Sequence, residues 1–211
     1  MNDNYDINKL RVQQFGLTAT IKDDNEKEHY FYRGHEYVEI GGVKWAVTNI
    51  GAEKESDSGL YFAFGETQGY TAEHVRSGER KFNENEYINP NFDSVKAYWG
   101  GKWRMPTEAE FRALIYSPNR WVDDYQGSGV NGRLFTDKTD WSKKLFFPSV
   151  GFCHNSTVEF VGTISYYWSS SLVNEPYEIN CAKSLDFYKY SECRIGHTCG
   201  IFGLPIRGII G

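Results

Sequence analysis

The chain has 211 residues, of which 40% are hydrophobic and 17% aromatic, so it is long enough to close one substantial core. Lys and Arg total 23 against 28 Asp and Glu, and no run of five basic residues occurs, so we expect no nucleic-acid partner. No stretch of about 18 apolar residues is present and the first residues do not resemble a secretory signal, so we expect neither membrane insertion nor a signal peptide.

The first 30 residues are polar and contain the charged run Lys22 to Glu28, which predicts an arm or linker before a single domain of residues 31–211. Leu10 to Ile21 carries most of the apolar residues of this arm. This stretch can dock as a strand or assemble against a neighbouring chain, so it is the candidate contact for a homo-oligomer. A leader remnant without a role is the alternative.

The first strands are expected after residue 36. Tyr37–Ile40 and Val43–Val47 alternate apolar and polar residues on either side of Gly41 and Gly42, which is typical of a β-hairpin. The polar stretch from Gln68 to Asn91 has no periodicity and is predicted to be a long surface loop.

Two helices are expected next. Asn91 to Tyr98 has one apolar face at helical spacing. The second helix has the stronger signal, because Thr107 can cap it while the Glu110 side chain returns to the backbone N–H of Thr107. This helix is expected to end near Ser117.

Strand-like segments dominate the rest of the chain. They are Arg133–Thr136, Leu145–Phe152, Ser165–Ser171, Cys181–Tyr188 and Gly203–Ile210. Early helices followed by late strands predict an α+β fold with antiparallel sheets. Four tryptophans lie among apolar neighbours and are expected in the core: Trp45, Trp99, Trp103 and Trp168.

Five sequence blocks together resemble the Fibrobacter major paralogous domain and its relatives in gut bacteria and their phages. The blocks, in the family's order, are Val43–Ala52, Gly59–Glu66, Trp103–Phe111, Tyr167–Ser171 and Gly203–Arg207. The resemblance covers about residues 36–210. It implies an α+β, C-type-lectin-like fold with two helices, small antiparallel sheets and a long irregular C-terminal region. It also implies recognition of a cell-surface protein or carbohydrate, at a virion or bacterial cell surface.

The C-terminal part is also similar to the variable proteins of diversity-generating retroelements, which randomise surface positions after the Trp-Ser-Ser-Ser block. On the strand ending at Tyr188, alternation predicts Leu185 and Phe187 inward and Ser184 and Asp186 outward. Residues 188–202 show no helical or strand period, which suits either a binding face or an ordinary irregular loop. The candidate ligand-binding residues are Asn174, Asn180, Ser184, Asp186, Tyr188, Tyr190, Arg194, His197, Ile201 and Phe202.

These residues predict binding by contact, with no catalytic residue. Arg194 can pair with a carboxylate, whereas the tyrosines and Phe202 can anchor on apolar or sugar faces. The function expected is therefore a ligand-binding module for receptor recognition or adhesion. A structural subunit of a fibre or pilus tip, assembled through Leu10 to Ile21, is an alternative.

An enzyme is the alternative from a different class. Formylglycine-generating enzymes carry a block similar to Arg104–Phe111 and work with a cysteine pair near the C-terminus. Cys193 and Cys199 are the only candidates for that pair, and they lack the sequence context that those enzymes use. Adjacent Cys153 and His154 would point to opposite faces of a strand, which disfavours a nucleophile and base.

No cofactor or metal is expected from the remaining motifs. The four cysteines form no C-x-x-C pair, so they are expected to be free thiols or to form at most two disulfides. Glu175-Pro176-Tyr177 replaces with Tyr the Asn of the calcium-dependent lectin motif, which leaves calcium as a minor alternative. The segment Gly127 to Gly132 lacks the features of a phosphate-binding loop and is expected to be a turn.

Overall fold

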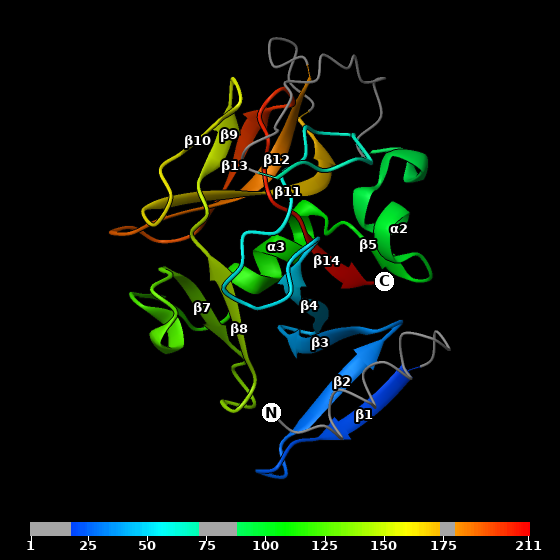
Figure 1. Ribbon diagram of the computed structural model, residues 1–211, viewed down its shortest axis with the longest axis vertical. Helices are drawn as coiled ribbons and strands as arrows, with labels where there is room; N and C mark the ends of the chain where they lie inside the picture. The colour runs from blue at the N-terminus through cyan, green and yellow to red at the C-terminus, as the bar shows by residue number, and fades with distance from the viewer. Residues whose placement is uncertain (1–17, 72–87, 174–179) are drawn as a thin grey trace.

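The computed structural model describes residues 18–71, 88–173 and 180–211, and most of their regular structure is β-strand (Figure 1). Fourteen strands form four antiparallel sheets, accompanied within these ranges by two α-helices. The predicted α+β, C-type-lectin-like class is therefore wrong, because the described chain is mostly β. Both helices are short, and several segments without any apolar alternation form strands by pairing with a neighbour.

The largest sheet has the order β1-β2-β3-β4-β14-β5, so the C-terminal strand lies between two strands from earlier in the chain. The predicted hairpin at Gly41 and Gly42 is confirmed, since Ile40 pairs with Val43 and both glycines have positive φ. The bounds are β1 Thr18–Lys22, β2 Glu28–Tyr32, β3 His35–Ile40, β4 Val43–Asn49, β5 Trp103–Arg104 and β14 Arg207–Ile210.

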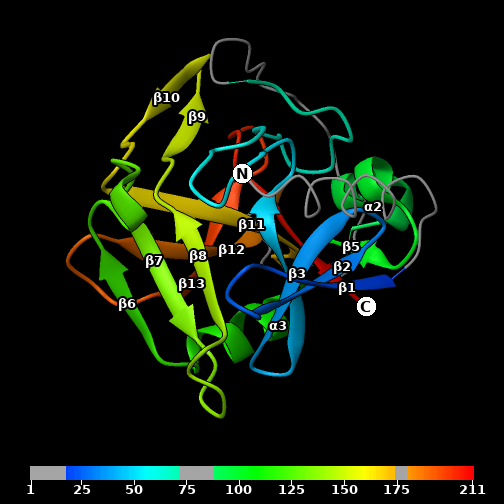
Figure 2. The ribbon, with the colours of Figure 1, turned by 60° about the horizontal axis from the view of Figure 1, so that its bottom comes forward.

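Part of the predicted N-terminal arm belongs to this sheet. Strand β1 forms its edge and pairs with β2, where Ile21 and Phe31 bury their side chains against each other. Figure 2 shows β1 and β2 lying across the face of the molecule that is turned forward there. Residues 1–17 lie outside the described residues, so assembly through the arm stays a prediction.

Three smaller sheets complete the fold. One has the order β6-β7-β8, another β11-β12-β13, and the third pairs β9 with β10. The bounds are β6 Asn119–Val122, β7 Gly132–Thr136, β8 Lys144–Pro148, β9 Phe152–His154, β10 Thr157–Glu159, β11 Ile164–Leu172, β12 Cys181–Tyr188 and β13 Arg194–Cys199. The predicted irregular C-terminal region is wrong in part, because β13 lies within it. Its residues pair with β12 although their own pattern shows no strand period.

Helix α2 (Ser94–Trp99) begins later than predicted. The segment Pro90–Phe92 forms a single 3-10 turn, η1, and Asp93 then caps α2 by accepting a hydrogen bond of 2.9 Å from the Lys96 backbone N–H. A second 3-10 turn, η2, spans Tyr125–Gly127. Most of the predicted loop at residues 68–91 lies outside the described ranges. None of the helices in those ranges is long and apolar enough to cross a bilayer.

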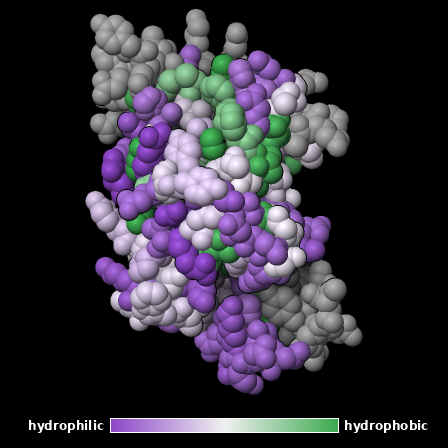
Figure 3. Space-filling view, turned by 90° about the vertical axis from the view of Figure 1, so that its left-hand side faces the viewer, coloured by the Kyte–Doolittle hydropathy of each residue, from purple (hydrophilic) through white to green (hydrophobic). Residues whose placement is uncertain are grey.

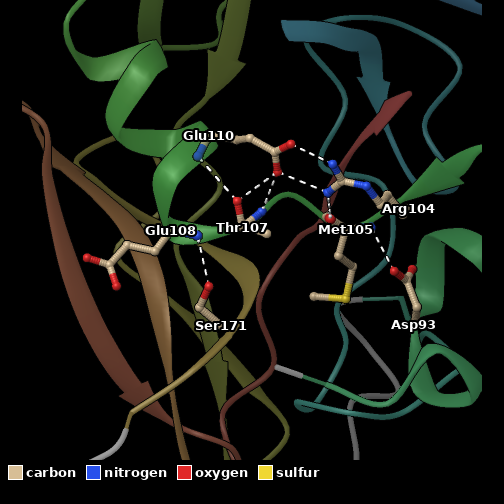
Figure 4. Close-up of polar contacts among 7 residues, drawn as sticks. All are labelled: Asp93, Arg104, Met105, Thr107, Glu108, Glu110 and Ser171. Carbon is tan, nitrogen blue, oxygen red and sulfur yellow. Dashed lines mark hydrogen bonds and ion pairs between the residues drawn. The ribbon is translucent and has the colours of Figure 1, made fainter. Parts of the chain in front are cut away.

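Helix α3 (Glu108–Ile115) confirms the predicted capping box (Figure 4). The Glu110 backbone N–H donates to Thr107 Oγ1 at 3.3 Å, and the Thr107 backbone N–H donates to Glu110 Oε2 at 2.7 Å. Arg104 holds the same carboxylate with two hydrogen bonds of 3.0 and 2.6 Å. Asp93, the N-cap of α2, also accepts the Met105 backbone N–H at 2.9 Å. Hydrogen bonds from β5 and the residue after it therefore reach both helices.

The core consists mainly of two clusters of buried side chains. One is built around Trp103 and Trp168, and the other around Trp45 and Phe111. The predicted burial of the four tryptophans is confirmed, since three are fully buried and Trp99 is 8% exposed. The sheet β11-β12-β13 contributes to both clusters, so its position is fixed by packing on the rest of the domain.

Candidate functional site

A pocket of about 550 Å³ lies beside the sheet β11-β12-β13, and we call it the β13 pocket. Its walls come from segments far apart in the sequence: β9, β11, β12, β13 and the turn after β13. Figure 3 shows the side of the molecule that is on the left in Figure 1, where apolar residues are most frequent in the upper half, interspersed with hydrophilic ones. The lining residues are Phe152, Tyr166, Cys181, Asp186, Tyr188, Arg194, His197, Thr198, Cys199 and Phe202.

Strand register places three polar residues of the pocket in one row. Tyr166 on β11 pairs with Asp186 on β12, and Asp186 pairs with Arg194 on β13. Directly paired residues point to the same face of an antiparallel sheet, with their side chains about 5 Å apart. A hydroxyl, a carboxylate and a guanidinium therefore follow one another across the sheet.

Aromatic rings form the second wall. Phe152 stacks on Tyr166 with ring centroids 5.2 Å apart, and Phe202 meets Phe152 edge to face at 5.6 Å. Tyr188 contacts Tyr166 at 6.1 Å. All four rings are half-buried, so each is held by a neighbour and keeps part of its surface accessible.

Asp186 is the buried charge of the pocket. The residue is 4% exposed, and its carboxylate accepts a hydrogen bond of 2.6 Å from Ser184 Oγ, while Arg194 Nε lies 3.7 Å from Oδ2. Burial raises the pKa of Asp186 to about 6, although the Ser184 hydrogen bond and the charges of Arg194 and His197 act in the opposite direction. The group therefore changes charge near neutral pH.

The Asp186 carboxylate fits beside β13 because Gly196 has no side chain. Gly196 lies opposite Ser184 on β13, and a Cβ atom there would overlap the Asp186 carboxylate. Any larger residue would push the carboxylate out of its position beside Ser184.

Arg194 stands at the mouth of the pocket. Its Nη2 donates a hydrogen bond of 2.8 Å to the Tyr188 hydroxyl, and its guanidinium lies 5.1 Å from the centroid of the Tyr188 ring. The side chain is 65% exposed. Arg194 is thus oriented by Tyr188 while its outer N–H groups remain accessible to a ligand.

Five of the ten candidate residues meet in the β13 pocket: Asp186, Tyr188, Arg194, His197 and Phe202. Asn174 lies outside the described residues. Asn180 precedes β12 with a left-handed backbone, and its carbonyl accepts the Gly200 N–H at 2.7 Å. Tyr190 and Ile201 are exposed, by 92% and 40%, and do not line the pocket.

Ser184 and Asp186 lie on the opposite face of β12 from Leu185 and Phe187, which are buried in a core cluster. Both residues were predicted to point outward, but Ser184 is fully buried and Asp186 is nearly so. The neighbouring strand β11 places Trp168 and Tyr166 opposite them, which covers this row. Ser184 therefore does not face solvent, and its role is to donate a hydrogen bond to the Asp186 carboxylate.

Sequence reasoning did not identify Phe152, Tyr166, Thr198 and Cys181, and it named Cys199 for the enzyme alternative but not as a ligand-binding residue. Alternation along β11 separates Tyr166 from the core residue Tyr167, which is a signal that was present in the sequence. Nothing local to Phe152 indicates that β9 lies beside β12 and β13. The pairing of Cys181 with Cys199 follows only once β13 is known to be a strand.

The cysteine pair of the enzyme alternative is not assembled. Cys199 Sγ lies 3.3 Å from Cys181 Sγ, whereas Cys193 is buried in a core cluster. Burial raises the pKa of the Cys193 thiol to about 12, which disfavours the reactive thiolate. No group of three or more His, Cys, Asp or Glu in the described ranges can hold a metal ion. The segment Glu175-Pro176-Tyr177 lies outside those ranges.

Comparisons of the chain with family models, with curated proteins and with solved structures find no match. The resemblance to the Fibrobacter domain and to retroelement variable proteins therefore rests on the sequence blocks alone.

Proposed function

We propose that this chain is a ligand-binding module for receptor recognition or adhesion, and that it takes part of a protein or glycan into the β13 pocket. The observation that carries this proposal is the convergence in one concave site of half-buried rings, a buried carboxylate and an exposed guanidinium. Ligand pockets commonly have volumes of roughly 300 to 1,000 Å³ and combine apolar side chains with polar groups that orient the ligand. The β13 pocket, at about 550 Å³, lies within this range and combines aromatic rings with a carboxylate and a guanidinium.

Each wall would supply a different contact. The rings of Phe152, Tyr166 and Phe202 can stack on the apolar face of a sugar or on an aromatic side chain. Asp186 can accept hydrogen bonds from hydroxyl or amide groups, and Arg194 can donate to a carboxylate or hydroxyl. The rings would supply apolar contact area, and the hydrogen bonds of Asp186 and Arg194 would fix the orientation of the ligand.

The ligand would be carried by a bacterial or other cell surface, with this chain displayed on a virion or a bacterial cell. Tyr190 and Ile201 are exposed in the same C-terminal segment and would extend the contact beyond the pocket. The resemblance to retroelement variable proteins supports a surface that differs between copies of the gene.

Binding of the purified chain to a glycan array and to bacterial cells tests the proposal. The variants Phe202→Ala and Arg194→Ala are expected to weaken binding roughly tenfold or more, as truncation of an aromatic or Arg anchor does at other interfaces. The matched controls are Tyr116→Ala and Arg112→Ala, which remove an aromatic and a guanidinium at exposed positions on or next to α3. Equal loss in controls and pocket variants, or no loss in either, would contradict the proposal.

The encoding DNA offers an independent test of diversification. A nearby reverse-transcriptase gene and an imperfect repeat of the region that encodes Trp168 to Arg207 are expected, with mismatches at template adenines. Without them, the pocket would be a fixed binding site and not a diversified one.

A further inference from the structure

Two cysteines face each other across strands β12 and β13. Cys181 pairs with Cys199 in the register of the sheet, and their Sγ atoms lie 3.3 Å apart without a disulfide between them. Both residues also line the β13 pocket. This places a thiol pair at the opposite end of the strands from the Asp186 and Arg194 pair.

The backbone around this pair is compatible with a disulfide. The Gly200 N–H donates to the Asn180 carbonyl at 2.7 Å, so these two residues form a hydrogen-bonded pair of the ladder. Hydrogen-bonded and non-hydrogen-bonded pairs alternate along an antiparallel ladder, so Cys181 and Cys199 form a non-hydrogen-bonded pair. Their Cα atoms are then separated by roughly 4.5 Å, which lies within the roughly 4.4 to 6.8 Å that disulfides span. Little backbone movement is needed to join them.

Cys199 also differs in access from the other three cysteines. Cys199 is exposed and lies on an edge strand, whereas Cys181 is 5% exposed behind it. Cys153 and Cys193 are buried in core clusters, and burial raises the pKa of both thiols. A reagent in solution therefore meets Cys199 first, with Cys181 as its nearest partner.

We propose that Cys181 and Cys199 are a reversible thiol–disulfide site that exchanges with small-molecule disulfides such as oxidised glutathione. The Cys199 thiolate attacks one sulfur of the disulfide and releases one small thiolate. The Cys181 thiolate then attacks the Cys199 sulfur of the mixed disulfide and releases the second. The two protein thiols are oxidised, the small disulfide is reduced to two thiols, and these take up the two protons.

The disulfide would tie the edge strand β13 to β12 at the wall of the β13 pocket. This restrains the strand that carries Arg194 and His197, so the oxidised form presents a more rigid pocket. The effect on binding rests on the proposed function, whereas formation of the disulfide does not.

The test is incubation of the full chain with oxidised glutathione, followed by digestion with trypsin and mass spectrometry without reduction. Trypsin cleaves after Lys183 and Arg194, so Cys181 and Cys199 lie on different peptides. We expect these peptides to be linked, with the loss of two hydrogens, and to separate again on reduction. Because Cys153 shares the peptide of Cys181, the variant Cys153→Ser is expected to give the same link.

Single variants establish the order of the steps. Cys181→Ser is expected to stop at a glutathione adduct on Cys199, and Cys199→Ser is expected to remain largely unmodified. Cys193→Ser is the control and is expected to form the link as the wild type does. A stable glutathione adduct on the wild type, or a link that involves Cys153 or Cys193, would overturn the proposal.

Thermal unfolding provides a second measurement that needs no ligand. The oxidised wild type is expected to unfold at a temperature higher by roughly 5 °C than the reduced protein, and Cys199→Ser is expected to show no such difference. Binding in both redox states would then be compared on the glycan array. A confirmed disulfide without any binding would refute the proposed function alone, whereas binding without a disulfide would refute only this inference.

Discussion

Arg207 and Asn49 are joined by a hydrogen bond of 2.8 Å, from Arg207 Nε to Asn49 Oδ1, in the interior of the protein. Both side chains are buried, and the other N–H groups of the guanidinium donate to backbone carbonyls of β4 and β8, including Ala46 and Phe146 at 3.1 Å. The ring of Phe147 lies 4.6 Å from the guanidinium carbon. One side chain thus connects β14 with β4 and with the sheet β6-β7-β8.

The variant Asn49→Ala is expected to destabilise the protein by about 3 kcal/mol, because it leaves a buried charged donor without its acceptor. The measurement is urea unfolding, compared with the wild type. Arg112→Ala is the matched control, since Arg112 forms an exposed pair with Glu108 at a spacing of four residues, and it should change stability by less than about 0.5 kcal/mol. An Asn49→Ala variant as stable as the control would show that the buried network contributes little.

Asp186 should give the stability an unusual dependence on pH. Its pKa is raised from 3.8 to about 6 in the folded state, so between these values the folded protein binds more protons than the unfolded chain. The contribution of this group is therefore fully present below about pH 4 and is lost as the pH rises through 6. The loss is of the order of 2 to 3 kcal/mol.

The variant Asp186→Asn cannot ionise, so its stability relative to the wild type is expected to improve between about pH 4.5 and 7.5. Urea midpoints over this range measure the difference. Asp140→Asn is the control, because the Ser142 hydrogen bonds lower the pKa of exposed Asp140 and place its titration below this range. If Asp186→Asn and Asp140→Asn gave the same flat profile relative to the wild type, the raised pKa would be refuted.

Thr107 should stabilise helix α3 through the hydrogen bond that it accepts as the N-cap. The variant Thr107→Ala removes the side-chain acceptor of the Glu110 N–H and is expected to cost about 1 kcal/mol of stability in urea unfolding. The loss should remain moderate because Arg104 still holds the Glu110 carboxylate. Thr157→Ala, at an exposed position of β10, is the control and should cost less. Equal costs would indicate that the cap adds nothing to α3.

The elements that the sequence predicted carry their signals locally. The capping box at Thr107 and the two-glycine hairpin at Gly41 each depend on a few adjacent residues, and both are confirmed. Two of the unpredicted strands, β6 and β13, are edge strands of their sheets, whereas unpredicted β2 lies between β1 and β3. An edge strand is paired on one side only and keeps many exposed side chains, so its sequence need not alternate between apolar and polar residues.

This explains the errors in fold class and in the site together. Residues 194–199 have the burial pattern of a half-exposed edge, and their strand conformation comes from the ladder with β12. A prediction that lacks β13 gives an α+β fold with an irregular C-terminal region, and it can locate neither the pocket nor the cysteine pair. The candidate binding residues on β12 could be predicted from the sequence because strand alternation is a local pattern. Phe152 could not, because it joins the pocket through a contact between segments that are distant in the sequence.

Gly196 links the edge strand to the charge of the pocket, which gives a prediction specific to this site. In Gly196→Ala the new Cβ would overlap the Asp186 carboxylate, so the carboxylate must move away from Ser184 or β13 must shift. We expect a loss of about 1 to 3 kcal/mol in stability from overpacking, together with a shifted pKa of Asp186 in an NMR titration.

Gly129→Ala separates these two effects. Gly129 has a φ of +75° with open space around its Cβ position, so alanine there is strained without contacting the pocket. This control should lose stability and leave the titration of Asp186 unchanged. A titration that is the same in Gly196→Ala as in Gly129→Ala would mean that the Asp186 carboxylate does not depend on the close approach of β13. The edge strand would then be free to shift without changing the charge of the pocket.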